Sequence, residues 1–179
     1  HCLCEEDNNL LASLFNPFQH IEYLGLEDWK FPQVPKWIGG LHYLRILELR
    51  VEETSTEQIH LLGELPSLVK LKFRPSRIPE ERAILGTGLF PVLEYFKFRT
   101  EEDAMAYLGF EMGAMPNLQT LALRNKEWGG GTPVGMEHLV RLQKIHLYRV
   151  DSGDATIVSA FRNALSAHPN CPSVSWSFY

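Results

Sequence analysis

The chain has 179 residues, of which 45% are hydrophobic and 22% are charged, and its formal net charge is −5. This apolar content is enough to close a core and excludes disorder as the main state of the chain. No apolar run approaches the roughly 20 residues of a bilayer-crossing helix, so we expect no membrane span.

Six blocks of alternating apolar residues follow one another along the chain, each of the form Leu-x-x-Leu-x-Leu with some Ile or Phe substitutions. The second apolar residue of each block, here called the anchor, follows the previous one by 23, 24, 25, 25 and 24 residues in turn. So even a step indicates a structural repeat. The anchors are Leu24, Leu47, Leu71, Phe96, Leu121 and Ile145.

Each block predicts a short strand, because alternate residues of a strand point to the same face. One block cannot bury its own leucines, so consecutive units stack and their strands join one parallel sheet. Units of about 20–29 residues are typical of leucine-rich repeats. We therefore predict the α/β class, as a leucine-rich repeat solenoid with a parallel sheet on the concave face and irregular or short helical segments on the convex face.

The segments between the blocks carry signals for short helices or for irregular loops. Thr54-x-x-Glu57 and Thr100-x-x-Asp103 have the spacing of a capping box, in which side chains bond the free backbone amides at a helix start. A similar short helix is expected over residues 10–15. Prolines after Trp29, and glycines over residues 129–133, make those two segments irregular.

After the sixth block the spacing changes. Residues 154–167 predict an amphipathic helix that His168-Pro169 ends, and residues 172–176 predict a last strand. We interpret residues 151–179 as the C-terminal cap of a single domain that spans residues 1–179. Residues 1–4 resemble the end of a strand whose beginning is missing, so we expect this domain to be truncated at its N-terminal side and to continue upstream in a parent chain.

Several motifs resemble the leucine-rich repeats of plant intracellular nucleotide-binding immune receptors, the disease resistance proteins. These motifs are Leu65-Pro-Ser-Leu68, Phe90-Pro-Val-Leu93, Met115-Pro-Asn-Leu118 and Pro35-Lys-Trp-Ile38. Residues 155–176, with His168-Pro-Asn-Cys-Pro172, resemble the C-terminal end of such receptors from grasses. The chain departs from the general repeat where Asn or Cys often follows the strand, since those positions hold Trp29, Glu52, Ser76, Glu101, Lys126 and Val150. We therefore expect an irregular horseshoe.

The resemblance implies a protein–protein interaction module. In the family, a signalling domain and a nucleotide-binding switch domain precede the repeats. By this resemblance the chain senses a pathogen effector, or a host protein modified by one. It also docks on the receptor's own nucleotide-binding domain and restrains it in the resting state.

Charges are unevenly distributed with respect to the anchors. Residues one before, one after and three after each anchor are expected on the concave face. Of these 18 positions, eight are Lys or Arg and two are acidic, so this face carries about +6 and the remainder about −11. The expected partner-binding residues on this basic face are Arg50, Lys70, Lys72, Arg74, Tyr95, Lys97, Arg99, Arg124, Lys144, His146 and Tyr148.

Four arginines share the position three residues after the anchor, and we call them the arginine column: Arg50, Arg74, Arg99 and Arg124. Neighbouring strands are about 4.8 Å apart, so these charges repel unless an anion compensates them. The sequence leaves two sources open. Either an acidic partner protein supplies the anion, or the chain folds its own glutamates over the column, namely Glu52, Glu53, Glu101 and Glu102 with help from Glu48. We expect no nucleic-acid partner, because no recognised nucleic-acid motif accompanies the basic face.

Aromatic residues share the predicted concave face. Tyr23, Tyr95 and Tyr148 lie there with His146. Exposed tyrosines beside arginines are typical of interface hot spots. Packing of Tyr23 and Tyr95 against neighbouring strands explains these residues equally well.

We find no catalytic constellation, and we expect neither enzyme activity nor a cofactor. The Gly-x-x-x-x-Gly-Lys-Ser/Thr loop that would cradle a nucleotide triphosphate does not occur. His1, Cys2 and Cys4 lack a second Cys/His pair at zinc spacing, so we expect no metal site. Cys171 is expected to be a small core residue.

Two other functions remain open. A substrate-recognition module of an F-box ubiquitin ligase has repeats of similar length and needs an F-box upstream. An extracellular receptor is disfavoured, because the chain has no Asn-x-Ser/Thr acceptor and no paired cysteines. We therefore expect a cytoplasmic protein, with the nucleus as a further compartment.

Overall fold

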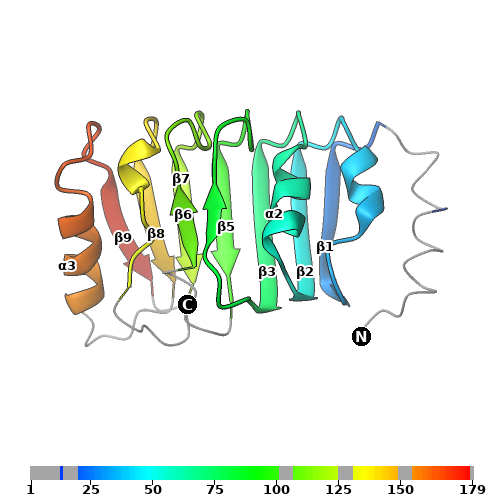
Figure 1. Cartoon of the computed structure of the whole chain (residues 1–179), viewed down its shortest axis with the longest axis horizontal. Coiled ribbons are helices and arrows are strands. Elements are labelled where there is room, and N and C mark those ends of the chain that lie inside the picture. Colours follow the sequence, from blue (N-terminus) through cyan, green and yellow to red (C-terminus); the bar gives the residue numbers. More distant parts are fainter. Residues whose placement is uncertain (1–12, 14–19, 101–106, 125–130, 149–154, 178–179) are drawn as a thin grey trace.

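The computed structural model describes residues 13, 20–100, 107–124, 131–148 and 155–177 of the chain. Within these ranges, seven strands form one parallel sheet in the order β1-β2-β3-β5-β7-β8-β9 (Figure 1). The strands are β1 (Tyr23–Phe31), β2 (Ile46–Glu53), β3 (Lys70–Arg77), β5 (Tyr95–Arg99), β7 (Thr120–Arg124), β8 (Lys144–Tyr148) and β9 (Ser173–Ser177).

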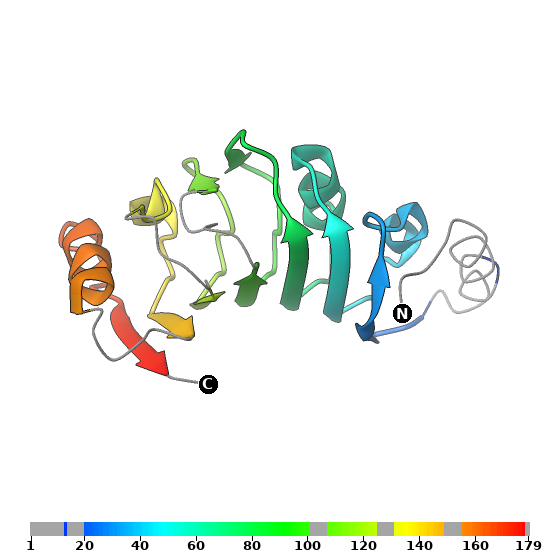
Figure 2. The same ribbon diagram turned by 90° about the horizontal axis from the view of Figure 1, so that it is seen from below.

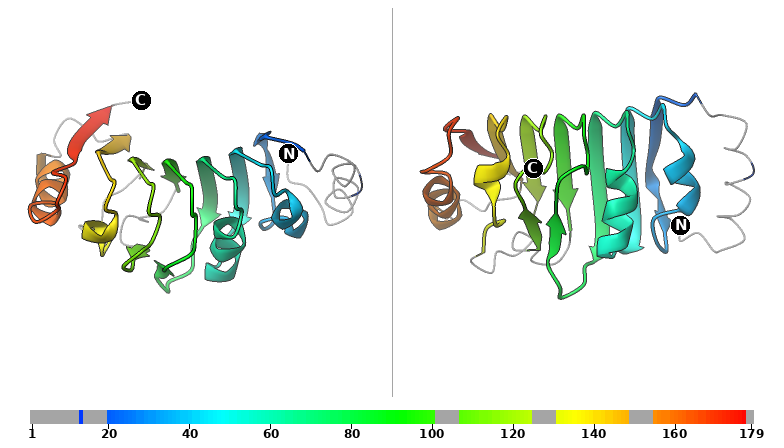
Figure 3. Two further views of the ribbon diagram at one scale, coloured as in Figure 1. Left: turned by 90° about the horizontal axis from the view of Figure 1, so that it is seen from above. Right: turned by 45° about the horizontal axis from the view of Figure 1, so that its top comes forward.

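The sheet lines the concave side of a curved solenoid, and the helices lie on the convex side (Figure 2). The two further views in Figure 3 show the same arrangement. The described convex elements are η1 (Lys36–Gly40), α2 (Thr56–Gly63), β4 (Ala83–Leu85), β6 (Leu108–Phe110), η2 (Met136–His138) and α3 (Ala155–Ala164). The predicted architecture is confirmed, and the convex elements differ in type from repeat to repeat, as the missing asparagines led us to expect.

The anchors align in neighbouring strands as predicted. Leu24 pairs with Leu47 and Leu71 with Phe96, and the alignment continues through Leu121 to Ile145. All six are buried, whereas the residues on either side of the anchor are partly exposed in β2, β3 and β5. The period-two pattern therefore separates a buried core face from an accessible concave face.

Phenylalanines connect the middle repeats through the core. Phe73 contacts Phe98 at 6.1 Å between ring centroids, Phe98 contacts Phe96 at 6.0 Å, and Phe96 stacks on Phe90 at 6.1 Å. All four rings are almost completely buried. Aromatic pairs at this distance add to the stabilisation that burial alone provides.

Strand β1 departs from the predicted register. Its pairing with β2 shifts between Leu26 and Lys30, so that Lys30 lies beside Arg50. The rule that the residue three after the anchor lies beside the arginine column therefore fails for β1, where that residue is Glu27. An irregularity of this kind inserts extra residues that have no partner on the neighbouring strand. Lys30 takes this position and pairs with Glu52, while the charge of Glu27 still acts on Lys72.

The predicted helix after Thr54 is confirmed as α2, but its cap differs by one residue. Ser55 is the N-cap, and its Oγ accepts a hydrogen bond from the Gln58 backbone N–H at 3.4 Å. The Gln58 side chain accepts from the Val34 backbone N–H of the previous repeat instead of closing the box. The Thr54-x-x-Glu57 capping box is therefore wrong, since Thr54 is buried beside the strand end.

Proline motifs mark tight turns at the entry to β5 and β7. Phe90 and Met115, each followed by proline, adopt left-handed conformations with φ of 54° and 41°. This conformation is costly for residues with a Cβ atom. Both side chains are fully buried, and the Phe90 N–H donates to the Gly63 carbonyl at 2.6 Å. Burial and this bond across repeats hold the strained turn.

The C-terminal helix α3 and strand β9 follow the prediction closely. Ile157, Val158, Phe161 and Leu165 are buried on one side of the helix. His168 is buried after it, where Nδ1 accepts from the Asn170 N–H and Nε2 donates to the Leu139 carbonyl at 3.1 Å. Cys171 is exposed, so the prediction of a core cysteine is wrong. Its left-handed turn, with φ of 44°, turns the chain into β9 while its side chain stays at the surface.

Some sequence expectations lie outside the described residues. These are the strand end at residues 1–4, the helix over residues 10–15, the capping residue Asp103 and the start of the glycine-rich segment at residue 129.

Candidate partner-binding face

The parallel register brings the eleven predicted binding residues onto the concave sheet. Lys70 lies beside Tyr95, and Lys72 beside Lys97. Arg50 lies beside Arg74, and Arg124 lies between Arg99 and Tyr148. On β8, Lys144 lies one residue before the anchor Ile145 and His146 lies one residue after it. Residues far apart in sequence thus share one surface.

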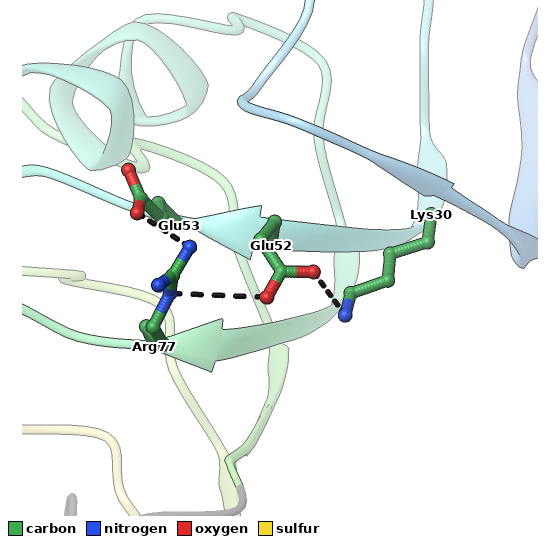
Figure 4. Close-up of polar contacts among 4 residues, drawn as sticks. All are labelled: Lys30, Glu52, Glu53 and Arg77. Atoms are coloured by element: carbon green, nitrogen blue, oxygen red, sulfur yellow. Dashed lines mark ion pairs between the residues drawn. The ribbon is translucent and has the colours of Figure 1, made fainter. Parts of the chain in front are cut away.

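Glutamates of β2 form ion pairs in the first repeats, but their partners are Lys30 and Arg77 and not the arginine column. Glu52 pairs with Lys30 and, at 3.8 Å, with Arg77, while Glu53 pairs with Arg77 at 2.7 Å (Figure 4). The hydrogen bond from Lys30 is the main cause that lowers the pKa of Glu52, and the charges of Lys30, Arg77 and Arg50 add to it. The two glutamates therefore pair with cations that flank the arginine column, and Glu101 and Glu102 lie outside the described residues.

Glu48 neutralises a lysine instead of the arginine column. Its carboxylate lies 2.5 Å from the Lys72 ammonium. The hydrogen bond that Lys72 donates to this carboxylate is the main cause that raises the pKa of Lys72, and the Glu48 charge contributes as well. Lys72 is therefore less available to a partner than the sequence suggested.

Three lysines of the face have no ion-pair partner in the described ranges, and two of them contact tyrosine rings. Among the described residues, Lys70, Lys97 and Lys144 form no ion pair. The Lys70 ammonium lies 5.3 Å from the centroid of the Tyr95 ring, and that of Lys97 lies 4.2 Å from the Tyr148 ring. Contacts with a ring face hold the ammonium groups in place without removing their charge. We call Lys70, Tyr95, Lys97, His146 and Tyr148 the tyrosine–lysine cluster.

The cluster spans β7 because the residue beneath it is small. Ala122 lies on the concave side between Lys97 of β5 and His146 of β8, yet it is fully buried. Burial, and after it the nearby Tyr148 hydroxyl, raises the pKa of Tyr95. Tyr148 of β8 thus lies close enough to Tyr95 of β5 to act on its pKa, although β7 runs between the two strands. Tyr95 is partly buried, whereas Tyr23 is 58% exposed, and the interface role of both tyrosines stays a prediction.

His146 joins the cluster to the last strand. Its Nδ1 lies 2.8 Å from the Ser175 hydroxyl and its Nε2 3.2 Å from the Ser177 hydroxyl. The ring meets Tyr148 edge to face at 4.3 Å. Burial lowers the pKa of His146, and the charges of Lys144 and Lys97 lower it further. Both effects favour the neutral form of the imidazole over the charged form.

A pocket of about 400 Å³, which the repeat pattern did not predict, opens beside the cluster. We call it the rim pocket, because its lining residues begin the strands: Glu22, Tyr23, Arg45, Ile46, Val69, Lys70, Glu94 and Tyr95. They occupy the two positions before the anchor in four consecutive repeats. The signal in the sequence is the set of residues at these two positions, in which the apolar Ile46 and Val69 lie between Tyr23 and Tyr95.

No metal site emerges from the described residues, because no three His, Cys, Asp or Glu side chains are grouped to hold an ion. None of the helices in the described ranges is long and apolar enough to cross a membrane. The arrangement offers cations, tyrosines and an apolar pocket, which are the components of a recognition surface.

Comparisons with known proteins agree with this description. Residues 2–174 match a family described as leucine-rich repeat region. The chain is 40% identical over 159 residues to "Disease resistance protein RGA5" of Oryza sativa subsp. japonica, a match that covers 82% of this chain and 14% of that protein. It is 31% identical over 124 residues to "Disease resistance protein RPM1" of Arabidopsis thaliana, covering 69% of this chain and 13% of that protein.

A further relative from Oryza sativa subsp. japonica, "Disease resistance protein Pik-2", is 28% identical over 185 residues, covering 93% of this chain and 18% of that protein. The chain thus spans less than a fifth of the length of these relatives. No solved structure matches the chain significantly.

Proposed function

Because the chain belongs to the leucine-rich repeat region of plant disease resistance proteins, we propose that it senses a pathogen effector, or an effector-modified host protein, through its concave face. We also propose that the same face restrains the nucleotide-binding domain of the receptor. As in the sequence analysis, we place the protein in the cytoplasm and, as a second compartment, in the nucleus. Residues 151–179 are proposed to cap the domain.

The observation that carries the proposal is that Lys70 and Lys97 of the tyrosine–lysine cluster form no ion pair within the part of the chain that the structure describes. Both ammonium groups contact tyrosine rings on an accessible face. An acidic protein surface complements such a face and is attracted to it at long range. Tyrosines beside these cations add contact area of the kind that dominates binding energy at interfaces.

The two proposed roles use one surface in two states. A resting receptor keeps the face on an acidic region of its own nucleotide-binding domain. An effector with a complementary acidic surface then competes for the same cations. Competition of this kind links recognition to release, because both ligands cannot occupy the face together.

Charge reversal tests the proposal. In a receptor that carries this chain as its repeat region, Lys70, Lys97 and Lys144 are changed together to Glu. We expect cell death without an effector, or loss of effector-triggered cell death, in a leaf assay. Arg162→Glu on α3 is the matched control, because Arg162 is an exposed cation on the convex side. If the triple variant accumulates normally and both responses are unchanged, the face does not have this function.

The F-box alternative receives no support from the observations. The relatives named above are disease resistance proteins. No feature of the basic face points to the substrate of a ubiquitin ligase.

A further inference from the structure

The rim pocket and the tyrosine–lysine cluster form one continuous surface. Lys70 and Tyr95 belong to both, since Tyr95 forms one wall of the pocket and its ring also faces the Lys70 ammonium. Apolar and cationic recognition elements therefore lie side by side, on strands β2, β3 and β5.

The pocket has the properties of an anchor site for a side chain. Its floor consists of Ile46 and Val69, which are only partly buried although they are apolar. Tyr23 rises on one side with 58% of its surface exposed, and Tyr95 closes the other side. A volume of about 400 Å³ accommodates one large apolar side chain and not an extended hydrophobic surface. Filling such a pocket removes apolar area of both partners from water.

The charges around the pocket give the ligand a direction. Glu22 and Glu94 lie at the outer edge, where Glu22 approaches Arg45 at 4.0 Å. Lys70 and Lys97 lie further along their strands, one residue before and one residue after the anchor, and we call this the inner side. Carboxylates of a ligand are repelled at the outer edge and attracted inward. The acidic part of a ligand thus lies over the cluster, with its apolar part in the pocket.

The spacing of the two lysines suits an extended acidic segment. Lys97 is one strand and two residues away from Lys70, because Lys72 pairs with Lys97. Strand spacing and rise place their Cα atoms about 8 Å apart. Alternate residues of an extended chain are about 6.6 Å apart. The flexible lysine side chains cover the small difference.

We propose that the rim pocket holds one aromatic or aliphatic side chain of an acidic partner segment, whose carboxylates at alternate positions bind Lys70 and Lys97. This inference rests on the proposed function, because it specifies how the basic face recognises its partner. It predicts a ligand that combines one large apolar residue with at least two Asp or Glu residues.

A random dodecapeptide library displayed on phage, selected on the immobilised 179-residue chain, tests the inference. We expect the selected peptides to combine an apolar residue with alternate acids. Peptides of this kind are then synthesised, and their affinity is measured by fluorescence polarisation. Ile46→Trp fills the pocket, and Lys70→Glu with Lys97→Glu reverses the charges. Each is expected to weaken binding about tenfold or more.

Two control variants make the same kinds of substitution at positions outside the site. Val140→Trp adds a ring at an exposed valine outside the pocket, and Arg162→Glu reverses a cation on the convex side. Both should bind as the unmodified chain does. Circular dichroism of every variant shows that the fold is retained.

The outcomes separate the two proposals. If Ile46→Trp keeps full affinity while the lysine reversals lose it, the pocket inference is overturned and the acidic-partner proposal stands. If the lysine reversals keep full affinity as well, or if selection enriches no acidic peptides, both are overturned.

Discussion

The Lys97 ammonium lies 4.2 Å from the centroid of the Tyr148 ring, although β7 separates the strands to which the two residues belong. The contact passes over Ala122, whose methyl group is fully buried beneath it. A small residue in one repeat thus lets side chains of the two neighbouring repeats meet. The tyrosine–lysine cluster depends on this gap.

The first prediction concerns this gap. Ala122→Leu is expected to lower the free energy of unfolding by about 1–3 kcal/mol, because the larger side chain overpacks the space under the cluster. Urea unfolding followed by circular dichroism measures the change. Thr120→Leu on the same strand is the control, since Thr120 is partly exposed whereas Ala122 is fully buried. Equal effects of the two substitutions would contradict the proposed covering of Ala122.

The second prediction concerns the cap of α2. Ser55→Ala should lower the free energy of unfolding by about 0.5–2 kcal/mol, because the Gln58 N–H loses its acceptor. Thr54→Val should be neutral or stabilising, since the buried Thr54 hydroxyl has no hydrogen-bond partner among the described residues. Urea denaturation of both variants decides the matter. A larger loss for Thr54→Val than for Ser55→Ala would restore Thr54 as the cap.

The third prediction concerns the turn before η2. Gly135 has φ of 76°, and a Cβ atom there would collide with the Phe110 backbone carbonyl. Gly135→Ala should therefore lower the free energy of unfolding by more than about 1 kcal/mol. Gly40→Ala is the control, because a Cβ atom at Gly40 would meet nothing within 4 Å and its φ is not in the left-handed region, so a change within about 0.5 kcal/mol is expected. Thermal unfolding that ranks the two variants in the opposite order would refute this.

The fourth prediction concerns pH. Burial and the charges of Lys144 and Lys97 lower the pKa of His146 in the folded state. The unfolded chain, in which histidine has a pKa of about 6.5, then binds more protons in the window just below pH 6.5. The stability that the neutral ring contributes is present above that pH and decreases as the pH falls through the window.

Urea unfolding at pH 7.5 and 5.5 checks this sign. The unmodified chain should lose more stability between the two values than His146→Gln does, because glutamine does not titrate. His146 contacts the Ser175 and Ser177 hydroxyls and the Tyr148 ring, and the charges of Lys144 and Lys97 act on it. The same loss in both proteins would show that His146 is not responsible.

Some of the candidate site was predictable because it follows from the repeat period. The step between anchors places Arg50, Arg74, Arg99 and Arg124 at one position of successive strands, and the structure pairs Arg50 with Arg74 and Arg99 with Arg124. The pairing of Glu52 with Lys30 was not predictable, because it depends on a register shift in β1 that the alternation of apolar residues does not record. Cys171 was misplaced for a similar reason, since its exposure depends on a left-handed turn before Pro172.

The sequence alone was sufficient for the solenoid, the parallel sheet, the buried anchors and the basic concave face. Each of these depends on local periodicity, because alternate residues of a strand must face the same side and equal repeats must stack. The tertiary structure was needed for the approach of Tyr148 to Tyr95 across β7, for the rim pocket and for the charge pairs that neutralise Lys72 and Arg77. These depend on side-chain lengths and on bulges in neighbouring strands, which only the packed sheet brings into contact.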